Sequence, residues 1–157
     1  MTIIKNARII TGDGRVIERG EVAFDDKMRY VGENYPGEAN EVIDASGYTV
    51  TPGLIDAHCH VGLFGDSTGF EGADANEDSD PIMPQLRAVD GINPQDRAFE
   101  DARRAGITTV VTGPGSANAV GGQFAAVKTY GVCVDDMLLK APCAMKMALG
   151  ENPKTVY

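Results

Sequence analysis

The chain has 157 residues, which is enough for one domain with its own core and too few for two large domains. Hydrophobic residues make up 43% and charged residues 24%, a balance typical of folded globular proteins that excludes a disordered chain. The formal net charge of -9, with no basic stripe, excludes nucleic acid as an expected partner.

The cysteine usage favours a reducing environment. There are three cysteines, Cys59, Cys133 and Cys143, widely spaced and without a CxxC pair. This pattern argues against a disulfide framework and against a four-cysteine zinc site. No apolar run approaches the roughly 18 residues of a membrane helix, and the opening "MTIIKNARII" is unlike a signal peptide. We therefore expect a cytoplasmic protein that has no membrane partner.

Residues 1–51 are expected to form strands. Short β-branched runs such as "TIIKNARII", "RVIERGEVAF" and "EVIDASGYTV" alternate with turn residues such as "TGDG". Strands spaced by about 8 to 12 residues between Gly, Asn and Asp signals are typical of a small antiparallel sheet. The pattern predicts four or five short strands.

The next part of the chain predicts a βαβ unit. Residues 53–60 form a mostly apolar run, as expected for a strand buried on both faces. Residues 94–105 have an apolar stripe with helical spacing, and Asn93 and Gly106 are suited to begin and end the helix. Residues 107–112, "ITTVVT", follow as a second strand.

The remaining segments are a long loop and two further strands. Residues 62–92 hold five glycines and an acidic run, and a loop of about 30 residues in a compact domain is usually functional or disordered. After the Gly-rich "GPGSANAVGG", the runs "QFAAVKTYG" and "MKMALG" predict strands, separated by a short helix at "VDDMLLK". The loop would follow directly after the first buried strand.

Both histidines of the chain lie at the end of that strand, in "TPGLIDAHCHVG". Successive strand residues point to opposite faces, so Asp56, His58 and His60 are expected on one face and Cys59 on the other. Two imidazoles on one face can converge on a divalent ion such as zinc. The alternative is a pair of histidines that bind only backbone or water, because two ligands alone do not make a metal site.

The segment "VIDASGYTVTPGLIDAHCHVG" resembles the signature of the amidohydrolase superfamily of metal-dependent hydrolases. The later "AGITTVVTGPGS" and "GGQFAAVKTYG" are similar to its imidazolonepropionase-related branch. The resemblance implies an α/β fold in which a small β-sandwich accompanies a (β/α)₈ TIM-like barrel. Residues 1–51 would belong to the composite sandwich domain, and residues 52–157 would form the first part of the barrel.

The length of the chain departs from this pattern. Eight strand-helix units take about 250 residues, and only two or three barrel strands can be counted here. The resemblance therefore implies the N-terminal portion of such an enzyme, with an incomplete barrel and no activity alone. The catalytic aspartate and the remaining histidine ligands would come from later strands, so no catalytic residue is assigned.

The resemblance also implies a ligand set for the metal, most simply zinc. His58 and His60 would be metal ligands, and Glu151, just after "MKMALG", is a candidate third ligand. Lys140 and Lys146 are weaker candidates, as a carbamylated lysine. Asp56 is expected to position a ligand or a neighbouring loop rather than to bind the metal itself.

The expected reaction of the full-length enzyme is hydrolysis of a C-N bond in a small amide or cyclic amide. The metal would activate water and polarise the substrate carbonyl. An alternative is a non-catalytic binding or assembly module that keeps the strand and the two histidines and acts by self-association. Since an unpaired strand edge is a template for association, a homo-oligomer is expected in either case.

Overall fold

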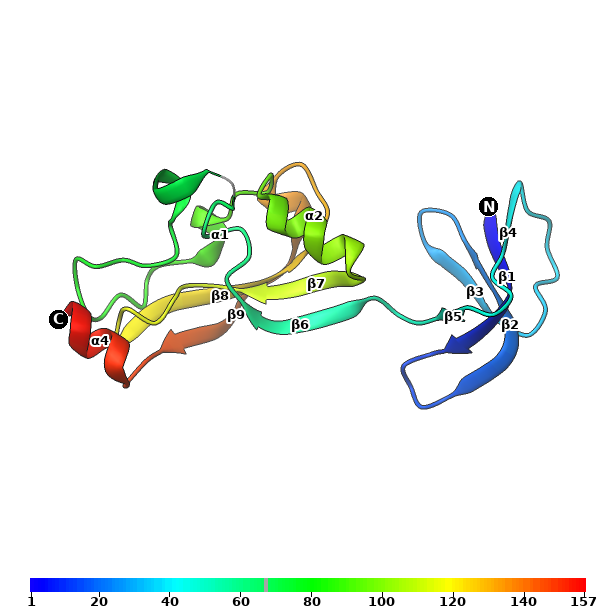
Figure 1. The fold of residues 1–157 in the computed structure, drawn as a ribbon, viewed down its shortest axis with the longest axis horizontal. Helices are drawn as coiled ribbons and strands as arrows, with labels where there is room; N and C mark the ends of the chain where they lie inside the picture. The colour runs from blue at the N-terminus through cyan, green and yellow to red at the C-terminus, as the bar shows by residue number, and fades with distance from the viewer. Residues whose placement is uncertain (67) are drawn as a thin grey trace. The chain divides into compact units, whose positions relative to one another are not determined.

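The computed structural model describes residues 1–66 and 68–157 (Figure 1). These residues form two compact units, Met1–Pro52 and Gly53–Tyr157. In the described ranges no helix has both the length and the apolar character that a membrane crossing requires. Each unit is built on its own sheet.

The first unit is a five-stranded sheet in which β3, β2, β1 and β4 lie in that order and β5 also pairs with β1. Its strands are β1 (Thr2–Ile10), β2 (Val16–Phe24), β3 (Met28–Gly32), β4 (Glu41–Asp44) and β5 (Thr49–Val50). The predicted number of strands is confirmed. The prediction of an antiparallel sheet holds only for β1, β2 and β3, because β4 and β5 both run parallel to β1.

One face of this sheet holds the core of the first unit, made of Ala7, Ile9, Val22 and Ala45. A bulge in β1 lies at Asn6, which has a φ of 60°, a left-handed conformation that asparagine tolerates better than most residues. The Asn6 amide donates to Asp44 Oδ1 over 3.0 Å, which links β1 to the end of β4.

The second unit holds a four-stranded sheet in the order β6, β7, β8 and β9. Its strands are β6 (Leu54–Cys59), β7 (Ile107–Thr112), β8 (Val120–Lys128) and β9 (Leu138–Met147). Its short helices are η1 (Gly69–Gly72), α1 (Ala88–Gly91), α2 (Arg97–Arg104), α3 (Val134–Met137) and α4 (Glu151–Val156).

The predicted βαβ unit is present, because β6 and β7 are parallel and α2 connects them. The helix begins later than expected. Asp96, rather than Asn93, is its N-cap, and the Asp96 carboxylate accepts from the Ala98 amide over 2.9 Å. Asn93 instead accepts from the Gln95 amide in the preceding turn. Gly106, with a φ of 85°, ends the helix as predicted.

The two strands after β7 run antiparallel to their neighbours. Successive strands of a (β/α)₈ barrel are parallel, so the barrel-type pairing of this unit is limited to β6 and β7. The fold is otherwise the expected mixture of α and β structure with an incomplete barrel. A cis peptide bond joins Ala141 to Pro142 within β9.

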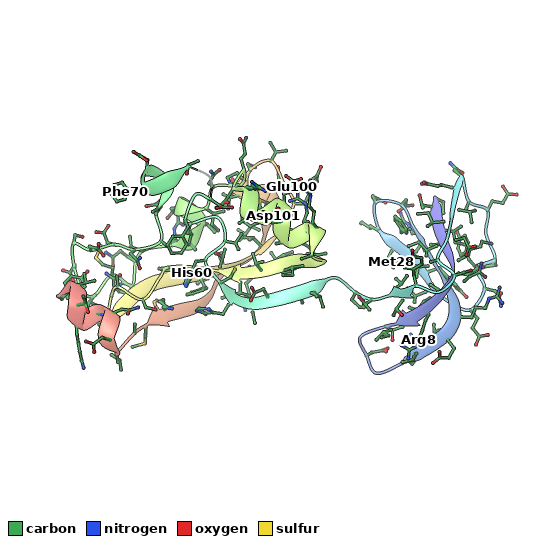
Figure 2. All side chains as sticks on the ribbon, viewed as in Figure 1. Arg8, Met28, His60, Phe70, Glu100 and Asp101 are labelled. Carbon is green, nitrogen blue, oxygen red and sulfur yellow. The ribbon has the colours of Figure 1, made fainter. Side chains whose placement is uncertain are left out.

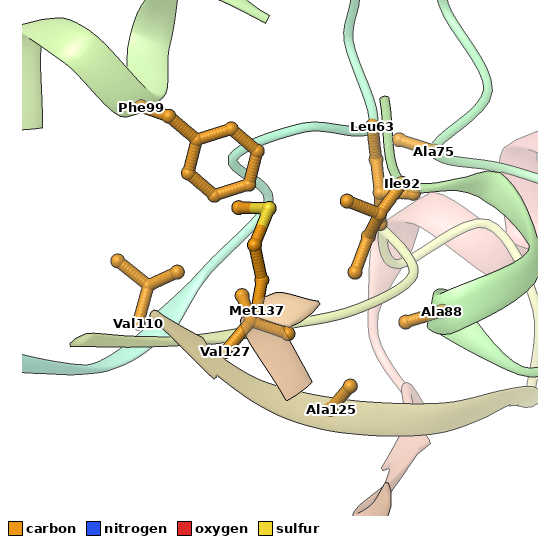
Figure 3. Packing of buried hydrophobic residues seen from close by; sticks show 9 residues of the cluster. All are labelled: Leu63, Ala75, Ala88, Ile92, Phe99, Val110, Ala125, Val127 and Met137. Carbon is orange, nitrogen blue, oxygen red and sulfur yellow. The ribbon is translucent and has the colours of Figure 1, made fainter. Parts of the chain in front are cut away.

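Helices α1 and α2 lie on the same face of this sheet and cover its core (Figure 1). Phe99 of α2 and Met137 of α3 meet Val110 and Val127 of the sheet there (Figure 3). All four side chains are at most 1% exposed. The opposite face of the sheet carries the two histidines.

The long segment between β6 and α2 is attached to the sheet. The amide of Met83 donates to Val120 O over 2.7 Å, and the amide of Gln123 donates to Leu86 O over 2.8 Å. Isolated parallel bridges join Ile82 to Val120 and Arg87 to Gln123. This part of the predicted loop therefore runs alongside the first half of β8.

Candidate metal site

The two histidines are side by side at the C-terminal end of β6. His58 lies within the strand and is exposed. Half-buried His60, labelled in Figure 2, follows directly after the strand. Their ring centroids are 5.3 Å apart and the rings meet edge to face. The prediction that both imidazoles share one side of the strand is confirmed. Polar side chains at this edge of a parallel strand pair occupy the position where barrel enzymes place catalytic groups.

Asp56 does not share this side as predicted, because β6 contains a bulge. The register pairs Asp56 with Val110 and Cys59 with Thr112, so three steps along β6 match two along β7. Val110 and Thr112 point the same way, and Asp56 and Cys59 consequently face the core side together. The Asp56 carboxylate accepts from the His58 amide over 3.1 Å, which stabilises the bulge rather than an imidazole.

Cys59 faces away from the histidines and packs against the core of the second unit. Burial raises the pKa of its thiol above the usual value, and the charge of Asp56 adds to this rise. The thiol is consequently neutral and poorly suited to bind metal. Its position agrees with the expectation that Cys59 lies on the face opposite the histidines.

The His60 ring is held by the main chain of the loop after β7. Its Nδ1 lies 2.6 Å from the carbonyl oxygen of Gly113. The amide of Gly113 in turn donates to Cys59 O over 3.4 Å. The residue Gly113 therefore contacts the end of β6 through both its N-H and its carbonyl oxygen.

An aromatic residue of β8 lies against both imidazoles. The Phe124 ring centroid is 5.4 Å from that of His58 and 6.4 Å from that of His60. Phe124 is only 4% exposed. The ammonium of Lys146, on β9, lies 6.0 Å from the same Phe124 centroid. Lys146 thus lies beside the aromatic ring that contacts both histidines, although it lies inside a strand.

The structure does not bring Glu151 to the histidines. Glu151 is the first residue of α4, is exposed, and lies 4.0 Å from the ammonium of Lys154. Across residues 1–66 and 68–157, no group of three or more His, Cys, Asp and Glu side chains is arranged to hold a metal ion. His58 and His60 are therefore the two candidate ligands that the described part of the chain brings together.

Gly113 and Phe124 were not identified as site residues from the sequence. Gly113 begins the Gly-rich run that follows a predicted strand, and Phe124 lies in the next predicted strand like any core residue. Gly113 is 53 positions from His60, and Phe124 is 66 positions from His58. Only the pairing of the strands brings these residues together. A glycine directly after the strand that pairs with β6 was the available signal.

Comparisons with known proteins find relatives along the whole chain. Amidohydrolase tasK of Hapsidospora irregularis is 32% identical over 191 aligned residues, which cover 99% of this chain and 19% of tasK. The crystal structure of an amidohydrolase from Thermotoga maritima MSB8 matches 100% of this chain with a TM-score of 0.91 and 42% identity. This chain belongs to the amidohydrolase superfamily.

Another relative matches a shorter stretch of the chain. The 5-methylthioadenosine/S-adenosylhomocysteine deaminase of Pyrococcus furiosus is 48% identical over 62 residues, 39% of this chain and 15% of the deaminase. The chain spans 41% of the Thermotoga amidohydrolase and about a fifth of tasK. No protein-family model matches it.

Proposed function

We propose that this chain contributes two histidine ligands to the metal site of a hydrolase that cleaves a C-N bond in a small amide or cyclic amide. The observation that carries the proposal is the pair of imidazoles 5.3 Å apart at the C-terminal end of β6. Superfamily membership supports the reaction class, since the relatives above are amidohydrolases and a deaminase by name. The activity belongs to the full-length protein.

The residues present fit half of a zinc site. Zinc in proteins is held by imidazole nitrogen at about 2.0 to 2.1 Å and usually has at least three protein ligands. His58 and His60 supply two nitrogen donors on one side of the strand, and imidazole nitrogen is a donor type that suits zinc. A third donor must come from elsewhere.

Lys146 is now a better candidate than Glu151 for that donor. It projects toward the Phe124 ring that lies against both histidines, whereas Glu151 pairs with Lys154 on α4. An ammonium cannot bind metal, so Lys146 would serve only after deprotonation or carbamylation. In its charged form the ammonium is stabilised near the ring face.

A divalent metal at this position would lower the pKa of a bound water and polarise the substrate carbonyl. The chain's own contribution is to orient the two imidazoles and to remove competing donors from their side of the strand. The Cys59 thiol faces the core, and the Asp56 carboxylate is occupied by the His58 amide. Asp56 and Cys59 therefore leave the histidines as the available ligands.

Cobalt(II) titration of the chain tests the ligand assignment, because cobalt replaces zinc and absorbs visible light. We expect saturable binding, weaker than at a three-ligand site, that is lost in a His58→Ala/His60→Ala double variant. Cys133→Ser, which removes an exposed thiol, is the matched control and should leave binding unchanged. Equal binding by the double variant would contradict the proposal.

A further inference from the structure

We propose that Gly113 and Phe124 are positioning residues that set the tautomer and orientation of the two histidines before any metal binds. The contacts that carry this inference are the Gly113 carbonyl on His60 Nδ1 and the Phe124 ring against both imidazoles. Only the statement that the two histidines bind a metal rests on the proposed function.

The contact with Gly113 fixes the tautomer of His60. A carbonyl oxygen only accepts hydrogen bonds, so Nδ1 at 2.6 Å must carry the proton. In the neutral ring the lone pair then lies on Nε2. An imidazole that donates one N-H to a fixed carbonyl presents its other nitrogen to a metal with defined geometry. His60 is thus preset as an Nε2 ligand.

The acceptor itself is firmly placed. Gly113 follows directly after β7, and its amide donates to Cys59 O, next to His60 in the chain. The carbonyl that accepts from His60 Nδ1 therefore belongs to a residue whose own N-H is bonded to the end of β6. A main-chain acceptor also has no titratable group and no rotamers, so it restrains the ring over the whole pH range in which the protein is folded.

Phe124 restricts the ring orientations. Its nearly buried ring lies 5.4 Å from His58 and 6.4 Å from His60, within the range of favourable aromatic pairs. Each imidazole therefore meets both its partner and the phenyl ring. This packing disfavours rotation of His58, which is otherwise exposed to solvent.

Glycine is required at position 113 for both contacts to coexist. A Cβ at this position would overlap the Phe124 ring. Any larger residue must therefore displace either the loop carbonyl from His60 or the ring from the histidine pair. The Phe124 ring can lie against the histidines only because Gly113 has no side chain.

The tautomer is measurable on the metal-free chain by long-range ¹H-¹⁵N NMR of the imidazoles. We expect His60 to be predominantly the Nδ1-H tautomer, whereas His58, with its ring exposed, should favour the Nε2-H form of free histidine in water. With only two histidines the spectrum is assigned by comparison with His58→Gln. A His60 ring in the Nε2-H form would overturn the inference.

Variants then separate positioning from folding. Phe124→Leu and Gly113→Ala should shift His60 toward a tautomer mixture and weaken cobalt binding by about tenfold or more. Val127→Ala, which shortens a buried side chain of the same strand that faces the opposite core, is the matched control and should change neither. An equal effect of Val127→Ala would show that Phe124 acts only through stability, and would overturn its positioning role.

The two proposals fail separately in this design. If His60 is Nδ1-H and depends on Phe124 while cobalt does not bind, the positioning inference stands and the metal proposal fails. If cobalt binds through the histidines while the tautomer is unaffected by Phe124→Leu and Gly113→Ala, the positioning inference fails alone.

Phe64→Leu is a second control. This variant alters an exposed ring 5.9 Å from His60 and should leave the tautomer unchanged.

Discussion

Phe99 is the largest of the fully buried side chains, and the core of the second unit is packed around it (Figure 3). Removing a buried phenyl ring loses its transfer free energy and leaves a cavity, so Phe99→Ala should destabilise this unit by about 3 to 5 kcal/mol. Native-state hydrogen exchange of the β7 and β8 amides measures the loss in this unit directly.

Phe70→Ala is the matched control, because this ring is 90% exposed and lies in the same unit. Its effect on the exchange of β7 and β8 should be within about 0.5 kcal/mol. Protection of these amides that is unchanged in Phe99→Ala would mean that the α2 contact contributes little to the sheet's stability.

At the residue scale, the sequence predicted what local periodicity determines. His58 and His60 are two positions apart, so strand alternation alone places them on one side. Asp56 is also two positions from His58, yet the bulge places it on the other side, and no local pattern indicates that extra residue. Glu151 was expected near the histidines from its place after a strand, but the antiparallel course of β9 determines where that strand ends.

The N-terminus of α2 gives a prediction at the scale of one element. Asp96 is 4% exposed and its carboxylate accepts from the Ala98 amide, one of the amides without a partner inside the helix. Asp96→Ala should destabilise the second unit by about 0.5 to 2 kcal/mol, whereas Asp96→Asn should retain most of the cap. The same hydrogen-exchange measurement applies.

Asp101→Ala is the control for this prediction. It removes a carboxylate from the same helix, where Asp101 pairs with Arg97 over 3.5 Å on the surface. An exposed pair of this kind is worth little, about 0.3 to 0.5 kcal/mol. A larger effect from Asp101→Ala than from Asp96→Ala would contradict the assignment of Asp96 as the cap.

The βαβ unit was predictable because its signals are local: an apolar strand, a helical stripe ended by Gly106, and a β-branched strand. The residue that caps the helix was not predictable, because Asn93 and Asp96 both have suitable side chains. In the fold the Asn93 amide donates to Gly62 O, a contact between segments far apart in the sequence. The antiparallel pairing of β8 and β9, and the parallel pairing of β4 and β5, also depend on partners far along the chain.

At the scale of the whole molecule, the sheet of the second unit ends in two edge strands, β6 and β9. Unpaired strand edges are templates for association, particularly where they carry exposed apolar side chains. Several such side chains are at least 43% exposed on these two strands: Leu54, Ile55, Leu139, Met145 and Met147. The edge strands therefore favour contact with another chain.

We expect reversible association that increases with concentration, measured by sedimentation velocity. Ile55→Lys and Met147→Lys, each placing a charge on an edge strand, should shift the distribution toward the monomer, because charges on edges oppose pairing. Tyr48→Lys, which replaces a 73% exposed ring in the first unit outside its strands, should leave it unchanged. A monomer at all concentrations would contradict the expectation. Association together with a failure to bind cobalt would favour an assembly module over a contributor to a metal site.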